Sequence, residues 1–173
     1  MKTVPAIDYK DAKDIVDAIV VKALQLRKAA VVAVTDAHGE LIAFGRMEGA
    51  PIASIRIAAN KAWTAARDRK PTKDIGDKIR DPMKGFDIAY YGDRRFVGWG
   101  GGIPIWKDGE VVGAIGVSGL SSAEDIALAN LGLEIIAVRD ETKLEPFNRC
   151  DPRWMGASQI WQNGFRIVLP HRS

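Results

Sequence analysis

Apolar residues recur along three stretches of the chain with the spacing of amphipathic helices. Over residues 8–28 they return every three to four positions, so that one face is apolar and most lysines and aspartates lie elsewhere. The same period predicts helices over 51–69, where the apolar face is rich in alanine, and over 122–139. Ser122 and Asp125 have the spacing of a capping box, which predicts that the third helix begins there.

Four β-rich runs lie between these helices and form two pairs. The first pair is 31–35 and 41–46, and the second pair is 103–106 and 110–117. Short turn sequences with Asp and Gly separate the two runs of each pair, which predicts two β-hairpins. Hairpins among helices imply an antiparallel sheet with helices packed on it, so the predicted fold class is α+β.

The remaining segments are less regular. Residues 67–96 carry several Pro and Gly residues and charges of both signs, which predicts a surface excursion with one short helix near 73–80. Both a functional role and a purely solvated surface remain open for it. We expect one domain over 1–139 and a C-terminal extension over 140–173, which packs on the domain or on a neighbouring subunit and includes a short strand at Phe165–Leu169.

Composition and charge narrow the class of protein. The 173 residues are 47% hydrophobic and 27% charged, and their net charge of +3 argues against a nucleic-acid-binding surface. Cys150 is the single cysteine, and His38 and His171 are the two histidines, so neither an intrachain disulfide nor a zinc finger is expected. No apolar run is long enough to span a membrane, and the first residues lack a signal-peptide core. We therefore expect a cytoplasmic protein that contacts neither nucleic acid nor a membrane.

Familiar catalytic motifs are absent from the sequence. It contains no P-loop, no G-x-G-x-x-G fingerprint for dinucleotides, and no H-E-x-x-H or C-x-x-C motif. Ser118 stands in the run 116–120, which resembles a nucleophile elbow but lacks its last glycine and ends a hairpin strand. The motifs therefore favour neither a serine hydrolase nor hydride chemistry with a redox cofactor.

The predicted second helix carries the first candidate site. Ser54 and Lys61 are seven residues apart, and Thr64 follows Lys61 by three, so the three side chains share one side of the helix. The surrounding residues are mostly alanines, which would let a ligand approach the lysine cation. The alternative is an alanine-rich packing helix whose lysine extends to water.

The second candidate site is the glycine run before the third strand. Gly100, Gly101 and Gly102 are conformationally free, and their N–H groups are suited to an anion-binding nest. The alternative is a tight bend at the edge of the sheet. Because the outer ends of a hairpin lie together, this run is expected beside the start of the helix at Ser121–Asp125, whose N-terminus also favours anions.

Three motifs together resemble the GlcG/HbpS family, which includes the C-terminal domain of PduO-type proteins. The resemblance covers residues 8–138 and rests on DAHGELIAFGRMEGAPIASIRIAANKAWTAA (36–66), GGGIPI (100–105) and GEVVGAIGVSGLSSAED (109–125). It implies a profilin-like α-β-α sandwich with about five antiparallel strands, and usually a homo-oligomer. It also implies a link to haem in some members and to the catabolism of small organic acids in others.

This sequence departs from the haem-binding pattern that the resemblance implies. Haem-binding relatives have a histidine near the N-terminal helix, whereas residues 8–28 contain no His, Cys or Met and offer only Tyr9 as an iron ligand. Glu48 also replaces the aspartate that is more usual after Arg46 and Met47. No cofactor is therefore predicted, although haem stays possible.

Two functional hypotheses remain. In the first, the protein is a lyase or isomerase for a small oxygenated organic acid, in which Lys61 and the glycine amides hold an oxyanion. Arg46 then binds a carboxylate, Glu48 or Asp125 carries the proton, and Ser54, Thr64 and Ser118 line the site. In the second, the same cleft binds haem or another small anion without turnover.

Overall fold

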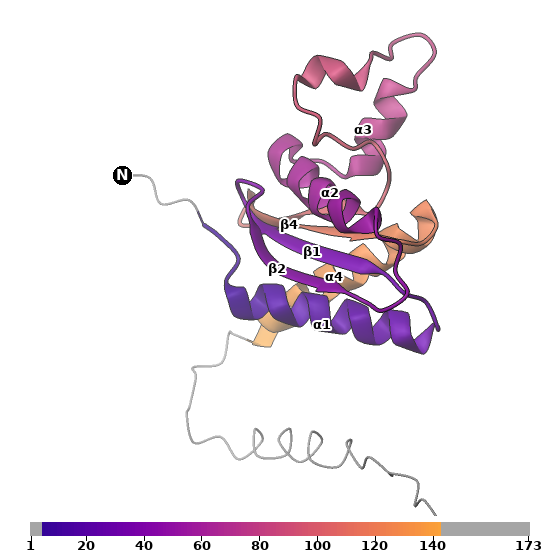
Figure 1. The fold of residues 1–173 in the computed structure, drawn as a ribbon. Helices are drawn as coiled ribbons and strands as arrows, with labels where there is room; N and C mark the ends of the chain where they lie inside the picture. Colours follow the sequence, from indigo (N-terminus) through magenta and orange to yellow (C-terminus); the bar gives the residue numbers. More distant parts are fainter. Residues whose placement is uncertain (1–4, 143–173) are drawn as a thin grey trace, which may run out of the picture. The chain divides into compact units, whose positions relative to one another are not determined.

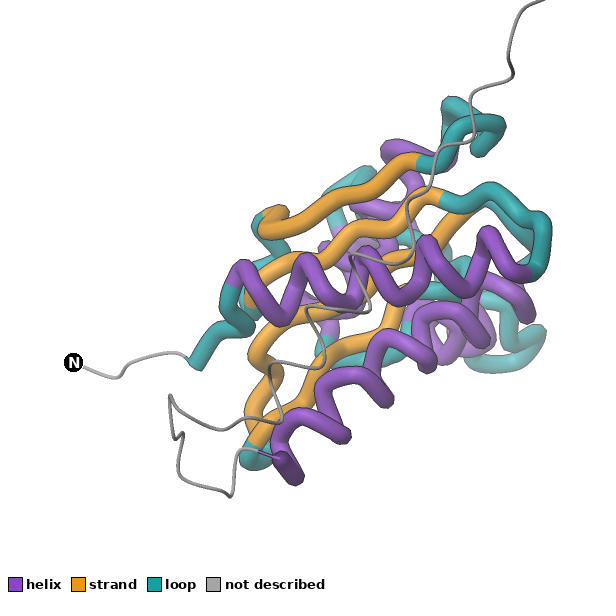
Figure 2. The backbone as a smooth tube through the Cα atoms, turned by 90° about the horizontal axis from the view of Figure 1, so that it is seen from below, coloured by secondary structure: helices purple, strands orange, loops and turns teal. Residues whose placement is uncertain are grey.

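The computed structural model describes residues 5–142, and Figure 1 shows that they form layers of helices around one sheet. The elements follow in the order α1 (Tyr9–Gln25), β1 (Val31–Asp36), β2 (Leu41–Arg46), α2 (Ser54–Asp68), α3 (Thr72–Ile79), η1 (Ile88–Tyr91), β3 (Gly102–Lys107), β4 (Glu110–Ser118) and α4 (Ser122–Thr142). Helix α2 covers one face of the sheet, and α1 and α4 run side by side across the other face (Figures 1 and 2). The α+β class and the α-β-α sandwich are confirmed.

The sheet joins the two predicted hairpins by pairing β1 of the first with β4 of the second. Its order is β2-β1-β4-β3, and all neighbouring strands are antiparallel. Val31 lies opposite Ser118 and Asp36 opposite Gly113, so β1 and β4 form the centre. The described residues supply four strands, whereas the family resemblance implied about five. That count was wrong for residues 5–142, where only the two hairpins contribute to the sheet.

The larger hydrophobic core lies between the sheet and the helices α1 and α4. Asp8 caps α1 by accepting a hydrogen bond from the Asp11 N–H at 2.7 Å. Ile15 and Ile19 of α1 are fully buried in this layer. Gly132 allows α4 to approach closely, because a Cβ there would lie 2.7 Å from the side chain of Ile115. Branched side chains therefore fill this side of the sheet at close packing.

Helix α2 packs on the opposite face through small residues. Ala58 and Ala62 form a buried cluster with Val31 and other small side chains. Gly116 of β4 lies directly beneath them, and a Cβ there would come within 2.1 Å of the Ala58 carbonyl oxygen. The backbone of α2 therefore rests on the sheet itself, which brings Lys61 to the end of β4.

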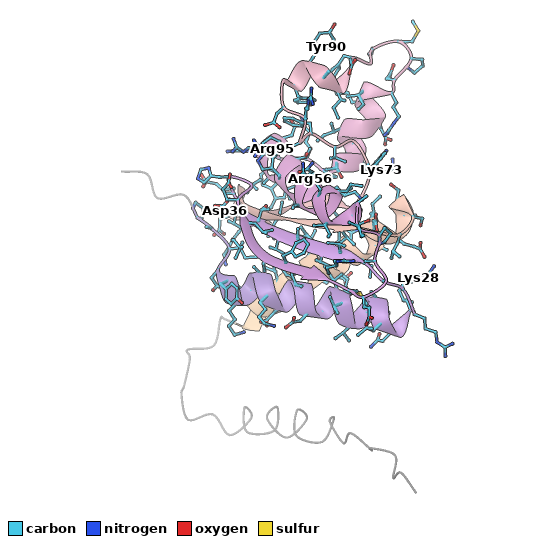
Figure 3. All side chains as sticks on the ribbon, in the orientation of Figure 1. Lys28, Asp36, Arg56, Lys73, Tyr90 and Arg95 are labelled. Atoms are coloured by element: carbon cyan, nitrogen blue, oxygen red, sulfur yellow. The ribbon has the colours of Figure 1, made fainter. Side chains whose placement is uncertain are left out.

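The segment between α2 and β3 forms the predicted excursion, and α3 confirms its short helix. Thr64 fastens the excursion to α2, since its hydroxyl donates to the Arg95 carbonyl oxygen at 3.1 Å. The Arg95 guanidinium also lies over the ring of Trp63, 4.1 Å from its centroid. Figure 3 shows Arg95 beside α2 and Tyr90 at the far tip of the excursion.

The predicted C-terminal extension lies outside the described residues, apart from the last turn of α4. The strand predicted at Phe165–Leu169 lies outside them entirely, so it stays a prediction. The domain predicted over 1–139 contains every strand of the sheet and most of α4.

Candidate functional site

Lys61 and Asp125, the two central residues of the enzyme hypothesis, form a buried ion pair. The Lys61 Nζ lies 2.8 Å from the Asp125 Oδ2 and also donates to the Val117 carbonyl oxygen at 2.8 Å. Each of the two residues is 2% exposed, so the lysine does not extend to water as the packing-helix interpretation assumed. Because α2 supplies the lysine and α4 the aspartate, the pair links helices that cover opposite faces of the sheet.

The environment of Asp125 disfavours its charged form. Burial raises the pKa of the Asp125 carboxyl above its usual range, and the hydrogen bond from Lys61 offsets this only in part. The Leu120 N–H also donates to Oδ1 at 3.2 Å. Removing one partner from such a pair lowers the stability of the fold more than replacing both by apolar residues, because the remaining charge stays buried without a partner. The geometry therefore supports a structural role for the pair, and proton transfer by Asp125 stays a prediction.

The start of α4 is capped one residue earlier than predicted. Ser121 Oγ accepts from the Glu124 N–H at 3.4 Å, and Glu124 Oε2 accepts from the Ser121 N–H at 3.1 Å. These reciprocal bonds are a capping box. The predicted box between Ser122 and Asp125 is wrong, because the Asp125 side chain turns inward to Lys61.

The glycine run lies against the ion pair, as the hairpin geometry predicts. Gly101 has a φ of +111°, and a Cβ there would lie 2.7 Å from the Val117 carbonyl oxygen and 3.1 Å from the Lys61 Nζ. The Gly101 carbonyl oxygen accepts from the Val117 N–H at 2.8 Å, and the Gly102 N–H donates to Thr72 Oγ1 at 2.9 Å. The bend at the sheet edge thus accounts for two of these glycines, since close packing leaves no room for a side chain.

The other predicted binding residues on α2 and β4 are buried in the fold. Ser54 begins α2 and Ser118 ends β4, and both side chains are largely removed from solvent. Thr64 is occupied by the bonds that hold the excursion. Gly100 faces Ile126, because a Cβ there would lie 2.5 Å from that side chain. Substrate binding by these residues stays a prediction.

Arg46 and Glu48 lie away from the ion pair, at the end of β2 and just beyond it. Both side chains are exposed. Within residues 5–142 neither takes part in an ion pair, and a guanidinium in this state is available to a carboxylate ligand. The structure therefore separates the predicted carboxylate-binding arginine from the predicted oxyanion-binding lysine.

A cavity of about 430 Å³ opens between α1 and β2. Helix α1 contributes a stripe of residues with helical spacing, and β2 with the residue after it contributes the other wall. The lining residues are Tyr9, Lys13, Val16, Asp17, Val20, Ile42, Ala43, Phe44, Gly45, Arg46 and Met47. The cavity thus combines an apolar surface with a phenol, a cation that has no ion-pair partner among residues 5–142, and an ion pair between Lys13 and Asp17.

Sequence analysis named Arg46 and Tyr9 separately but did not place them in one cavity. The two residues lie on different elements, and the sequence does not show that α1 packs along β2. A usable signal existed in the spacing of Tyr9, Lys13 and Val16, which puts them on one stripe of the helix. The apolar neighbours of that stripe face the sheet, so its polar members lie at the boundary of the helix and β2.

The part of the chain that the structure describes contains neither a cluster of metal ligands nor a membrane-spanning helix. Residues 5–142 contain no group of three or more His, Cys, Asp or Glu side chains arranged to hold a metal ion. None of their helices has the length and apolar character needed to cross a bilayer.

Comparison with known proteins places the fold in a family. The model of the family described as "Haem degrading protein HbpS-like" matches residues 7–134. The chain belongs to the HbpS-like family. This match confirms the resemblance to GlcG and HbpS proteins. The matched residues include all of the described helices and strands except the end of α4.

The relatives of this HbpS-like chain include both short and long proteins. It is 33% identical over 131 residues to an uncharacterised 15.0 kDa protein of the dhaT-dhaS intergenic region of Citrobacter freundii, covering 76% of this chain and 92% of that protein. It is 31% identical over 133 residues to the corrinoid adenosyltransferase PduO of Salmonella typhimurium, covering 77% of this chain and 40% of PduO. The crystal structure of a PduOC–haem complex superposes with a TM-score of 0.71 at 30% identity, covering 75% of this chain and 94% of that one.

Proposed function

We propose that this protein binds haem, or a closely similar planar anion, without turnover, and that the α1–β2 cavity is the binding site. One observation carries the proposal. The cavity combines an oxygen donor and an available cation, Tyr9 and Arg46, with apolar walls. Lys61, in contrast, is buried against Asp125 and Val117.

The residues of the cavity fit a haem group. Haem iron requires an axial ligand, and tyrosine is one of the side chains that proteins use. The Tyr9 phenol would hold the iron here, because α1 contains no His, Cys or Met. Met47 is less suitable, since it is buried and its sulfur lies 3.4 Å from the Ala30 nitrogen as a hydrogen-bond acceptor. When bound, the group would supply an iron centre with redox chemistry of its own.

The charges around the cavity define how the carboxylates of such a ligand are held. Arg46 is the main anchor, since a guanidinium binds a carboxylate with two parallel hydrogen bonds. Lys13 is already paired with Asp17, and this hydrogen bond raises the pKa of the lysine. Lys13 therefore stays protonated but contributes less net charge to the site than Arg46.

The family supports the haem part of this proposal. The matched family is described as haem-degrading, and a solved relative is a complex with haem. Turnover of a small organic acid at Lys61 receives no comparable support, because the ammonium group already has a carboxylate and a carbonyl as partners. The enzyme hypothesis, assembly into a homo-oligomer and a cytoplasmic location stay predictions.

Titration of the purified protein with haemin tests the proposal. We expect one equivalent to bind with a sharp Soret band, and Arg46→Ala to weaken binding by roughly tenfold, as the loss of one charge-assisted contact implies. Arg94→Ala is the matched control, because Arg94 is exposed on the excursion rather than beside α1. Haemin that adsorbs without saturation, or that binds both variants equally, would overturn the proposed site.

A further inference from the structure

Small side chains fill the interface between α2 and β4, and at one end of it they give way to two serines. Ala58 of α2 lies over Gly116 of β4, because a Cβ on that glycine would come within 2.1 Å of the Ala58 carbonyl oxygen. Ser54 precedes Ala58 by one helical turn, and Ser118 follows Gly116 by two strand positions. Each serine therefore lies on the same side of its element as the residue in the contact, so both side chains face the α2–β4 interface.

Contacts at the two ends of the interface fix how α2 runs along β4. At one end Ala66, in the last part of α2, belongs to a buried cluster with Ala114. At the other end Pro51, just before α2, lies beside Gly119, since a Cβ on that glycine would be 3.6 Å from the proline side chain. The start of α2 therefore lies over the end of β4, which brings the two serines together.

The hydroxyl groups of these serines have no partner in the described part of the chain. Ser54 and Ser118 are 5% and 4% exposed, yet between residues 5 and 142 neither side chain makes a hydrogen bond, to the other or to a third group. Among the same residues, the unpaired side-chain atoms that are fully enclosed are Thr35 Oγ1 and Trp63 Nε1. The serine oxygens are not among them, so each keeps a contact with solvent. Because a polar group in a nearly buried position is stabilised by a hydrogen bond, these two hydroxyls are suited to an incoming ligand.

The start of α2 adds backbone donors to the two hydroxyls. Its N-cap residue is Ala53, so no side chain caps the helix. The N–H groups of Ile52 and Ala53 also lack a backbone hydrogen-bond partner in the region that the structure describes. The N-terminus of a helix carries a partial positive charge and binds anions through such free N–H groups. Two hydroxyls and two N–H groups thus lie near one another where α2 begins.

We propose that this end of the α2–β4 interface, the Ser54–Ser118 site, binds a small oxyanion. One oxygen of the ligand accepts from both serine hydroxyls and bridges them, and a second oxygen accepts from the free N–H groups. Carboxylates and phosphates share this chemistry, so the ligand is a small organic acid or a phosphate. Lys61 is paired with Asp125, so the positive potential comes from the helix rather than from a free ammonium group. Binding is therefore expected to be weak, in the millimolar range.

This site does not depend on the proposed function. Helix α2 covers one face of the sheet, whereas α1, which forms a wall of the α1–β2 cavity, covers the other (Figure 1). Neither serine belongs to the lining of that cavity. Haemin binding and oxyanion binding are therefore separate properties, and the failure of either one leaves the other standing.

An NMR titration of the isotope-labelled full chain tests the site. Sodium phosphate and sodium acetate are added in separate experiments, and sodium chloride at matched ionic strength is the reference. At least one of the two oxyanions should shift the Ile52 and Ala53 amide signals in a saturable manner, and the one that binds identifies the ligand as a phosphate or a carboxylate. No saturable shift with either salt, or the same shifts with chloride alone, would overturn the proposal.

Serine variants separate ligand binding from packing. Ser118→Ala should weaken oxyanion binding by roughly fivefold, as the loss of one neutral hydrogen bond implies, and Ser54→Ala should do the same. Ser122→Ala is the matched control, because Ser122 is an exposed serine at the start of α4, and its affinity should be unchanged. Since the two hydroxyls are unpaired without ligand, their removal should leave the melting temperature unchanged. Equal affinity in all three variants, or a lower melting temperature without a loss of affinity, would contradict the site.

Discussion

Replacement of Lys61 by methionine separates a structural role of the ion pair from a catalytic one. The change keeps an unbranched side chain that is one atom shorter, but it leaves Asp125 buried without its cation. At about 4 Å and an effective dielectric constant near 20, the attraction between two unit charges is about 4 kcal/mol. Breaking a buried pair on one side costs about 3–5 kcal/mol. We therefore expect the unfolding free energy of Lys61→Met to fall by about 3–5 kcal/mol, and its melting temperature by roughly 10–15 °C.

The pH dependence of this loss identifies its cause. A carboxyl whose pKa is raised by folding stabilises the folded state below its unfolded pKa, and that stabilisation disappears as the pH rises through the folded pKa. Burial already raises the pKa of Asp125, and loss of Lys61 must raise it further. The loss of unfolding free energy in Lys61→Met should therefore be largest at neutral pH. It should shrink toward about pH 4, where the carboxyl of the unfolded chain takes up its proton.

Urea unfolding at several pH values provides the measurement. The double variant Lys61→Met/Asp125→Leu is the internal control, because replacement of both charges by apolar groups should restore most of the lost stability. A loss below about 1 kcal/mol in Lys61→Met, or a double variant no more stable than the single one, would refute the reasoning. An unchanged melting curve combined with lost turnover of an organic acid would instead favour catalysis by Lys61.

Two further predictions concern the glycine run and the excursion. Gly101→Ala should lower the unfolding free energy by about 2 kcal/mol or more, because a φ of +111° and a Cβ at 2.7 Å from the Val117 oxygen both oppose a side chain; a thermal melt equal to that of the unmodified chain would contradict this. Hydrogen bonds from Arg95 lower the pKa of Asp93 to about 2, so the stabilisation from this exposed pair is present above the unfolded pKa near 4 and is lost as the pH falls through about 2. An NMR titration of the Asp93 carboxyl checks the value, and a midpoint near 4 would show that the pair does not form in solution.

Local sequence signals predicted most of the fold. Helical spacing located α1, and the Asp-Gly turns located both hairpins, because these features depend on neighbouring residues. The strand order β2-β1-β4-β3 was not predicted, because the pairing of β1 with β4 joins residues that are far apart in the chain. The irregular excursion was found from its Pro and Gly content, although the contact of Arg95 with Trp63 that holds it was not.

The long-range contacts of the candidate site could not be predicted from local sequence signals. Lys61 and Asp125 are 64 residues apart, and spacing on one helix could not show that the lysine meets a carboxylate rather than a ligand. The same limit applied to Tyr9 and Arg46, which share a cavity only because α1 packs along β2. Sequence analysis therefore identified chemically suitable residues but grouped them into a cleft that the structure divides between a buried ion pair and a separate cavity.

The identity of the axial ligand tests the central claim most directly. Resonance Raman and visible spectra of the ferric haemin complex report whether a phenolate is bound to the iron, and the unmodified chain should show that signature. Tyr9→Phe should lose it, while Tyr90→Phe, which alters an exposed tyrosine at the tip of the excursion, should keep it. Phenolate bands that persist unchanged in Tyr9→Phe, or that are absent from a stoichiometric complex of the unmodified chain, would contradict binding in the α1–β2 cavity through Tyr9.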